Sequence, residues 1–247
     1  MPVNTSIPAD KPHQAVPRQV ISCRGNGFSV TERELVEEVF YEIYVNGEQV
    51  DDITCSPWDI QDAVIGGLYL KGLLHSPEEI RSMEIFDDTQ KILVCIESGS
   101  IPQEAPDQVV SLTPETVIAL SRRLEDESHL FHRTGGVHSA VLARDGEFLI
   151  RREDVSRHMT IDKAVGACLQ KGISLPGLVL VFSGRVASEI AKKAAAIGCS
   201  AIIARSAPTD YACQIAEQAG ITLIGFARDD NFNIYTCPQR VTLAETQ

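Results

Sequence analysis

Alternating apolar and polar positions dominate the first third of the chain and predict β-structure over residues 19–55. The β-branched and aromatic run at residues 39–45 is followed by Asn46-Gly47, which is favoured in two-residue hairpin turns. Residues 59–74 follow a helical period, with apolar side chains on one side. A second hairpin is predicted over residues 83–97, turning at residues 87–90.

Strand and helix patterns alternate in the second half. Thr113-Pro114 opens a helix, with threonine as N-cap and proline in the first turn. Continuous apolar runs are typical of strands covered on both faces, and they occur at residues 178–182 and 201–204. The other predicted elements are a hairpin at 140–150, helices at 156–171, 186–197 and 208–219, and strands at 221–226 and 231–235. The alternation predicts a layered α/β domain over residues 134–240, with the two apolar runs as central strands.

Two stretches divide the chain. Residues 1–18 contain four prolines and no apolar core, which indicates a disordered arm. A loop rich in glycine, proline and serine at residues 97–106 indicates a domain boundary. We therefore expect an N-terminal α/β domain over residues 19–108 and a second α/β domain over residues 109–247.

Charge and cysteine content narrow the function classes. The formal net charge is −12, and a net-acidic chain is poorly suited to non-specific nucleic-acid binding, so no nucleic-acid partner is expected. No run of 18 apolar residues is present, so no membrane span is expected. The seven cysteines are odd in number and widely spaced, without a Cys-x-x-Cys pair. This favours free thiols in a reducing cytoplasm and argues against a disulfide framework.

Three short segments have the composition of anion-binding loops. Residues 134–138 read Thr-Gly-Gly-Val-His, and paired glycines allow a backbone to approach a ligand, although a tight turn without a ligand explains them too. Ser183-Gly184-Arg185 lies between a buried strand and the next helix, where open α/β sheets bind ligands. The third segment, residues 206–209, also joins strand to helix, and a plain helix start is its simpler interpretation.

The densest group of polar residues spans residues 153–163. Two acids, an arginine and a histidine fall within six residues at the start of a predicted helix, where the helix dipole favours acids. Helix capping with surface ion pairs is the alternative interpretation. His158 and Asp162 are four residues apart, so we expect them to face each other and the carboxylate to raise the proton affinity of the imidazole or to orient it.

A zinc-deaminase site is not expected. Its signature needs His-x-Glu and a Cys-x-x-Cys pair, whereas His138-Ser139-Ala140 lacks the glutamate. The wide spacing of the thiols also predicts that no metal, and in particular no zinc, is held through cysteine.

Taken in order, these segments resemble the motifs of the FdhD/NarQ family of formate dehydrogenase accessory proteins. The similarity covers about residues 35–240. The matching segments are residues 42–47, 57–60, 66–68, 134–140, 153–163, 182–185, 206–209 and 223–228.

The resemblance implies a fold and a role. The fold would be a small N-terminal α/β domain plus a C-terminal domain resembling the layered cytidine-deaminase fold. Members of the family look like homodimeric sulfur carriers: they take sulfur as a persulfide from a cysteine desulfurase and pass it to the molybdenum bis-molybdopterin guanine dinucleotide cofactor of formate dehydrogenase. The cofactor, or a guanine nucleotide, is the expected ligand.

Motifs and resemblance together predict one set of binding residues. The set comprises Thr134, Gly135, Gly136, His138, Glu153, Asp154, Arg157, His158, Asp162, Lys163, Ser183, Gly184, Arg185, Pro208, Thr209, Phe226, Ala227, Arg228, Asp229, Asp230 and Asn231. Within it, the N–H groups of Gly135, Gly136 and Gly184 are expected to face phosphates, with Arg185 and Arg228 as counter-charges.

The sequence departs from the family at the sulfur-carrying segment. Family members carry Cys-Gly-x-Cys-Gly between the domains, whereas the corresponding stretch here has Cys95 alone. Three hypotheses follow: a cofactor-binding maturation factor without the usual sulfur handling, a sulfurtransferase that uses the single thiol of Cys95, and a non-catalytic docking protein. Because Cys95 lies in an apolar strand pattern, we expect it to be a buried and unreactive core residue.

Overall fold

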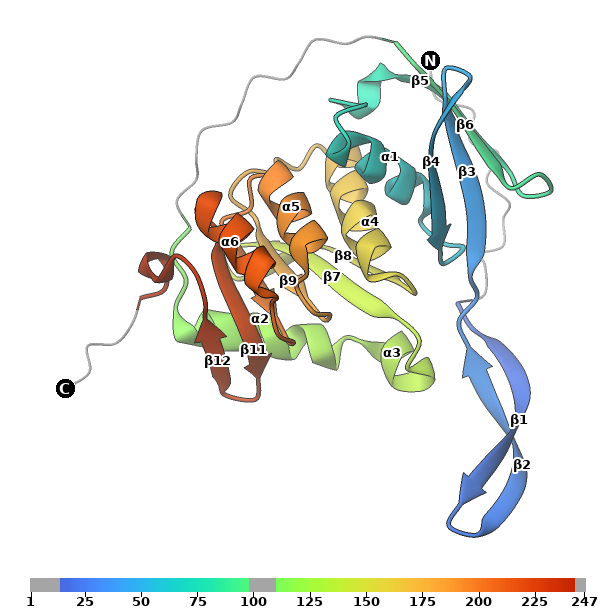
Figure 1. Ribbon diagram of the computed structural model, residues 1–247, viewed down its shortest axis with the longest axis horizontal. Coiled ribbons are helices and arrows are strands. Elements are labelled where there is room, and N and C mark those ends of the chain that lie inside the picture. Colours follow the sequence, from blue (N-terminus) through green and yellow to red (C-terminus); the bar gives the residue numbers. More distant parts are fainter. Residues whose placement is uncertain (1–13, 98–109, 243–247) are drawn as a thin grey trace.

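The computed structural model describes residues 14–97 and 110–242, which form two packed α/β units and a projecting two-stranded ribbon (Figure 1). The strands are β1 (Val16–Arg24), β2 (Gly27–Leu35), β3 (Val39–Val45), β4 (Glu48–Cys55), β5 (Ile80–Phe86), β6 (Lys91–Ile96), β7 (His138–Arg144), β8 (Glu147–Asp154), β9 (Val179–Phe182), β10 (Ala201–Ala204), β11 (Thr222–Arg228) and β12 (Asn231–Ile234). The helices are α1 (Ile60–Leu70), α2 (Pro114–Asp126), α3 (His129–Thr134), α4 (Arg157–Gln170), α5 (Ser188–Ala196) and α6 (Asp210–Gln218), with short 3-10 turns at Pro77–Glu79 and Pro238–Arg240.

The C-terminal unit is a six-stranded sheet with the order β12-β11-β10-β9-β7-β8. Strands β9, β10 and β11 are parallel, because helices α5 and α6 return the chain between them. The apolar runs of β9 and β10 are fully buried, since α4, α5 and α6 cover one face of the sheet and α2 covers the other (Figure 1). The predicted α/β class and both central strands are confirmed.

The N-terminal unit is a four-stranded sheet, β4-β3-β6-β5, with α1 packed on one face. Its two hairpins turn at the predicted places, Asn46-Gly47 and residues 87–90. Both Asn46 and Gly47 have positive φ, as a tight two-residue turn requires.

The two units meet along α1 and α4, which cross at their backbones. A Cβ atom on Gly66 would lie 1.9 Å from the carbonyl oxygen of Asp162, and one on Gly166 would lie 2.0 Å from that of Asp62. Only glycine permits this approach. The crossing joins the two units into a single body.

Most predicted helix starts lie close to the observed ones. Thr113 is the N-cap of α2 and accepts a hydrogen bond from the Thr116 amide, as predicted. Helices α5 and α6 begin two residues later than predicted, because Val186 and Pro208 form a β-bridge that holds the two preceding loops extended.

The prediction of a disordered arm over residues 1–18 is wrong for the last residues of that range. Strand β1 already begins at Val16, since Val16, Pro17 and Arg18 pair with Leu35, Glu34 and Arg33 of β2. Cross-strand pairing to a segment that the sequence analysis had assigned to the next domain explains the difference. Most of the predicted boundary loop at residues 97–106 lies outside the described residues. Among the described helices, none is long and apolar enough to cross a membrane.

Candidate functional site

The candidate site is the edge of the C-terminal sheet where β9, β10 and β11 end. Strand β7 is antiparallel to β9, with Ala140 opposite Phe182, so His138 at the start of β7 lies at the same edge. Strand β8 is antiparallel to β7 and places Asp154 opposite His138. Chain segments that are far apart in sequence therefore converge where α/β sheets commonly bind ligands.

The loop after β9 has the groups of an anion site. Gly184 is buried, and a Cβ atom there would lie 3.0 Å from the Phe182 ring and 3.4 Å from His138 Nδ1, so a side chain would not fit without movement. The N–H groups of Gly184 and Arg185 have no hydrogen-bond acceptor among the described residues. The exposed Arg185 side chain forms no ion pair in the same part of the chain.

Two helices direct their N-termini toward this edge without a side-chain cap. Neither Ser156 before α4 nor Ala187 before α5 accepts a first-turn amide with its side chain, and Ala187 cannot. The first N–H groups of a helix are unpaired donors at the positive end of its dipole. The uncapped start of α5 follows directly on Arg185, so donors and cation lie together.

Three side chains that are cationic or titratable, those of His138, Arg157 and His158, border the loop. The Ser139 amide donates to Ser183 Oγ at 2.9 Å, and Ser183 Oγ lies 3.5 Å from His138 Nδ1. The Nε–H of Arg157 points to His158 Nε2 at 3.3 Å, and His158 Nε2 lies 3.4 Å from a Glu189 carboxylate oxygen. Arg157 forms no ion pair with a carboxylate in the described residues, which leaves its charge for a ligand.

Both imidazoles are held neutral at pH 7. Burial is the main cause that lowers the pKa of His138, and the positive charge of Arg157 lowers it further. The pKa of His158 is also lowered, first by burial and then by Lys193, while Glu189 opposes the shift. The positive charge of the site therefore comes from the arginines and the helix ends.

Asp154 and Lys163 lie beneath this edge with fully buried side chains. Lys163 Nζ is 2.5 Å from Asp154 Oδ2, donates to the Ser56 carbonyl at 3.1 Å and lies 5.3 Å from the centre of the Trp58 ring. Asp154 also accepts the amides of Ser56 and Ser156 at 3.0 and 2.7 Å. These two predicted binding residues hold the N-terminal unit against the edge and expose no atoms to a ligand.

The predicted contact between His158 and Asp162 is wrong. The buried carboxylate of Asp162 pairs with Lys193 of α5, at 2.5 Å between Oδ1 and Nζ. The lowered pKa of His158 also contradicts the expected rise in its proton affinity. His158 and Asp162 are four residues apart on one helix as predicted, but Lys193 of α5 pairs with the Asp162 carboxylate instead.

Gly135 and Gly136 do not offer free donors. The Gly135 amide donates to Phe131 O, where Gly135 ends α3 with φ +67°, and the Gly136 amide donates to Thr134 Oγ1 at 3.1 Å. The prediction that these amides face phosphates is therefore wrong, and the tight-turn interpretation describes them. Of the three predicted glycine donors, Gly184 alone keeps its amide free of the described residues.

The loop before α6 is a capped helix start. Thr209 Oγ1 accepts the Ala212 amide at 3.2 Å, and the Thr209 amide donates to Val186 O at 2.9 Å. Pro208 forms the bridge to Val186 described above. This matches the simpler interpretation of residues 206–209, although the loop lies beside residues 183–186 at the same edge.

The turn between β11 and β12 borders the edge on its far side. Phe226 is exposed with φ 54° at a register shift, and its amide donates to Ser206 O. The Nε–H of Arg228 donates to Arg205 O at 2.6 Å, and Asp230 pairs with Arg122 of α2. Ala227 is buried, whereas Asp229 and Asn231 are exposed. Glu153, at the other border, pairs with Arg151 at 2.9 Å.

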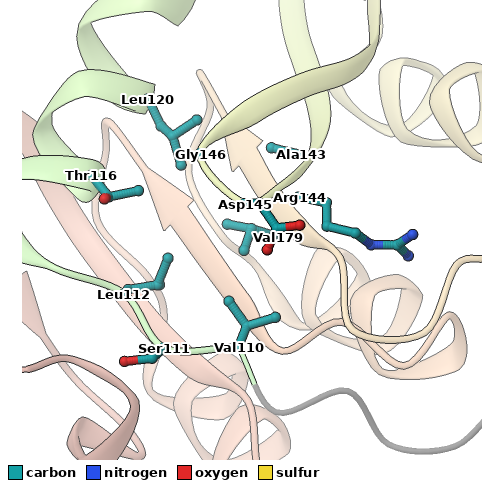
Figure 2. Close-up of a pocket in the computed structure, with 10 residues that line it drawn as sticks. All are labelled: Val110, Ser111, Leu112, Thr116, Leu120, Ala143, Arg144, Asp145, Gly146 and Val179. Carbon is teal, nitrogen blue, oxygen red and sulfur yellow. The ribbon is translucent and has the colours of Figure 1, made fainter.

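A pocket of about 490 Å³ lies at the opposite edge of the sheet (Figure 2). It is enclosed by the β7–β8 turn, the start of β9, the first two turns of α2 and residues 110–112. Apolar Leu112, Leu120 and Val179 form much of its lining, and the guanidinium of Arg144 points away from the hollow in Figure 2. None of the predicted binding residues lines this pocket.

The predicted burial of Cys95 is wrong, because its side chain is exposed. Strand β6 alternates: Ile92 and Val94 are buried against α1, while Leu93 and Cys95 point to the other face of the sheet. The run of apolar residue types concealed this two-residue period. Among the described residues, no group of three or more His, Cys, Asp or Glu side chains is placed to hold a metal ion.

Four residues of the site escaped the sequence analysis of binding residues. Ser56 and Trp58 belong to the other unit, and Lys193 reaches Asp162 from α5, so only the tertiary structure reveals them. Glu189, which contacts His158, lies in the first turn of α5. Its place just after a strand-end loop was a usable signal.

A model of the FdhD/NarQ family matches residues 36–109 and 96–242, so the chain belongs to this family. The chain is 35% identical over 231 residues to the sulfur carrier protein FdhD of Shouchella clausii, covering 81% of this chain and 86% of that protein. It is 32% identical over 249 residues to the sulfur carrier protein FdhD of Staphylococcus aureus, covering 90% and 94%.

A solved structure shares the fold. A crystal structure from Desulfotalea psychrophila, described as that of a candidate formate dehydrogenase accessory protein, superposes with a TM-score of 0.80 at 24% identity. The match covers 92% of this chain and 99% of that one.

Proposed function

We propose that this chain is a maturation factor for a formate dehydrogenase that binds a guanine nucleotide, or the molybdenum bis-guanine-dinucleotide cofactor as cargo, by its phosphates. One observation carries the proposal: at one edge of the sheet lie the amides of Gly184 and Arg185, the uncapped N-terminus of α5 and the charges of Arg157 and Arg185, all without a partner in the described part of the chain. The names of the relatives, FdhD sulfur carriers, support the same role.

The donor set suits a phosphate. Backbone amides at a helix N-terminus accept negative charge without rearrangement, and arginine adds two parallel hydrogen bonds to phosphate oxygens. His138 and His158 are neutral at pH 7, so they can donate or accept one proton each in a hydrogen bond with the ligand. The bound cofactor would supply the molybdenum that receives sulfur, while the protein would hold its nucleotide.

A guanine-nucleotide titration tests the site. We expect GDP to bind the wild-type chain, and Arg185→Ala to weaken binding by ~1.5–3 kcal/mol, or roughly tenfold to a hundredfold in Kd, the range for a hydrogen bond to a charged group. Lys171→Ala is the matched control, because this exposed lysine lies at the other end of α4. GDP binding that is absent, or equal in both variants, would contradict the proposal.

Sulfur transfer through Cys95 is the second candidate function, and the exposure of this thiol favours it. The Cys95 thiolate would attack the outer sulfur of a persulfide on a cysteine desulfurase. The new S–S bond forms on Cys95 as the old one breaks, and the desulfurase leaves as its thiolate, so no further oxidant is needed.

Persulfide labelling after incubation with a desulfurase and cysteine tests this step. Label on the wild type and on Cys23→Ser, but not on Cys95→Ser, would support a single-thiol carrier. Cys23 is the matched control because it is a second exposed thiol. Equal labelling of Cys95→Ser would exclude the candidate.

A protein that only docks other maturation factors is the third candidate, and it would fail both tests. Under the main proposal the partner is a formate dehydrogenase, and the second candidate adds a cysteine desulfurase. We also propose a homodimer, as the family resemblance implies, in which each copy has its own nucleotide site.

A further inference from the structure

One ring nitrogen of His158 faces two partners that need it in opposite protonation states. The Nε–H of Arg157 donates to His158 Nε2 at 3.3 Å, which requires a lone pair on that nitrogen. A carboxylate oxygen of Glu189 lies 3.4 Å from the same Nε2, and it can accept a hydrogen bond there only when the nitrogen carries a proton. The nitrogen holds either a lone pair or a proton, so it satisfies one partner at a time.

The contact with the neutral ring occupies one donor of Arg157. Arginine binds a phosphate through two parallel N–H donors of its planar fork, and Nε–H is one of the five that it has. A neutral His158 therefore withholds a donor that Arg157 could direct at an anion. Once Nε2 gains a proton it can no longer accept from Arg157, and Glu189 becomes its hydrogen-bond partner.

Arg157 lies close to the open amide of the loop after β9. Its positive charge lowers the pKa of His138, whose Nδ1 is 3.4 Å from the place that a Cβ atom on Gly184 would take. Arg157 forms no ion pair with a carboxylate in the described part of the chain. An anion bound at the Gly184 amide would therefore have the Arg157 guanidinium as a nearby counter-charge.

The other charges around the ring leave Glu189 as the group that favours its protonated form. Lys193 Nζ lies 3.4 Å from the His158 carbonyl oxygen and pairs with Asp162 at 2.5 Å, so it is held in place. Burial lowers the pKa of His158, and the charged neighbours that lower it further come from three elements: Lys193 of α5, Arg157 of α4 and His138 of β7. Glu189 of α5 acts in the opposite direction.

We propose that Glu189 is a positioning residue of the anion site: it accepts the proton-bearing Nε2 of His158 and thereby releases the Nε–H of Arg157 for an anionic ligand. The inference rests on the proposed phosphate-binding function and adds the uptake of one proton from solvent to it. Anion and proton then strengthen each other's binding, because each removes Arg157 or His158 from the contact that opposes the other. By linkage the two effects are equal in size.

The pH dependence of nucleotide binding tests the coupling. The probe is GDP-mannose, because both of its phosphates are esterified, whereas the terminal phosphate of GDP itself titrates near pH 6, at about the second pKa of a phosphate monoester. We expect binding to the wild type to tighten by roughly fivefold between pH 7.5 and 5.5, the low end of typical couplings, since Glu189 is 68% exposed. Calorimetry in two buffers of different ionisation enthalpy should show proton uptake on binding.

His158→Gln identifies the group that takes the proton. The glutamine amide oxygen can still accept from Arg157 but does not titrate, so we expect proton uptake to fall by at least half. His129→Gln is the matched control, because this exposed histidine lies in α3, and it should retain the wild-type uptake. Uptake in His158→Gln equal to that of the wild type would place the proton elsewhere and overturn the inference.

Glu189→Gln separates positioning from a structural role. A negative charge beside the anion is lost, so binding at pH 7.5 should tighten, while the further gain at pH 5.5 should shrink. Glu48→Gln, which changes an exposed acid of the N-terminal sheet, should keep the wild-type pH profile. Binding that weakens equally at both pH values in Glu189→Gln would show a structural role and overturn the inference.

An NMR titration of the His158 ring in the ligand-free chain tests the competition without any nucleotide. Arg157→Ala should raise the pKa of His158, and Glu189→Gln should lower it further; no change in either variant would overturn the inference. GDP-mannose that binds with equal affinity at both pH values and without proton uptake would also overturn it, yet leave the proposed function standing. No nucleotide binding at any pH would overturn both.

Discussion

Two polar segments of the C-terminal unit resemble each other in composition but point in opposite directions. Residues 153–163 turn their acids and Lys163 inward, where Asp154 and Lys163 are fully buried. Residues 183–185 turn outward, with the Arg185 side chain exposed and its amide free of described acceptors. The first segment joins the two units of the protein, and the second leaves its donors open at the candidate site.

The comparison shows that two polar segments of similar composition can have different roles. One supports the packing of the two units, and the other forms part of the candidate site. A buried ion pair must be satisfied completely, and Asp154 and Lys163 have the partners for that: two amides, one carbonyl and an aromatic face. Arg157 and Arg185 lack such partners within the described chain. Substitutions in the support should therefore affect stability, and substitutions in the site should affect binding.

The largest effect is expected from Lys163→Met. It leaves the Asp154 carboxylate buried and unpaired, which costs about 3–5 kcal/mol of unfolding free energy by the usual range for broken buried pairs. Urea unfolding measures this, with Lys171→Met as a control that removes an exposed lysine at the end of the same helix. Equal midpoints for the two variants would show that the segment is not a support.

Gly66→Ala tests the crossing of α1 and α4. The new Cβ would lie 1.9 Å from a backbone oxygen, so the helices must separate, at a cost of ~1–3 kcal/mol typical of overpacked interiors. Gly67→Ala is the matched control, because its new Cβ would lie 3.9 Å from Asp162 Oδ2, an ordinary contact distance. The same urea curves report both variants, and a tolerated Gly66→Ala would contradict the close crossing.

The pH dependence sharpens the comparison at the site. Burial lowers the pKa of His138 and His158 in the folded chain, so below about pH 6.5, the usual histidine value, the unfolded chain binds more protons and stability falls. Unfolding at pH 7.5 and 5.5 should show a smaller loss for His138→Gln than for the wild type. His129→Gln, an exposed control, should keep the full loss.

The smallest effect is expected from Cys95→Ser. An exposed side chain on an open sheet face contributes little, so the unfolding free energy should change by less than about 0.5 kcal/mol. Cys55→Ser, in the core beneath the same sheet, should cost more. If Cys95→Ser destabilised the protein as strongly as Cys55→Ser, the exposure of Cys95 would be in question.

Much of the fold could be predicted because local rules act within a few residues. The Asn46-Gly47 turn, the Thr113 cap and the apolar runs of β9 and β10 each follow from neighbours in sequence. The errors arose where a contact with a segment distant in sequence determined the local structure. The examples are the pairing of residues 16–18 with β2 and the bridge between Val186 and Pro208, after which two helices begin later than predicted.

The meeting of the candidate loops at one edge could be predicted, but their hydrogen-bond contacts could not. Strand-end loops brought His138 and Ser183-Gly184-Arg185 to one edge, as the order of strands and helices implied. The amides of Gly135 and Gly136, by contrast, were already used by Phe131 and Thr134, and Asp162 was taken by Lys193. A hydrogen-bond donor is free only if no neighbour in space accepts it, and sequence spacing does not report that.

The sequence by itself determined the α/β class, the family resemblance and the meeting of the candidate strand-end loops at one edge of the sheet, because periodicity and turn chemistry are local properties. Only the tertiary structure decided which side chains of that edge are buried and which are free. It buried Lys163 beneath Trp58 and exposed Cys95, against expectation. Burial depends on which elements pack on each face, and that packing is set by contacts between residues far apart in the chain.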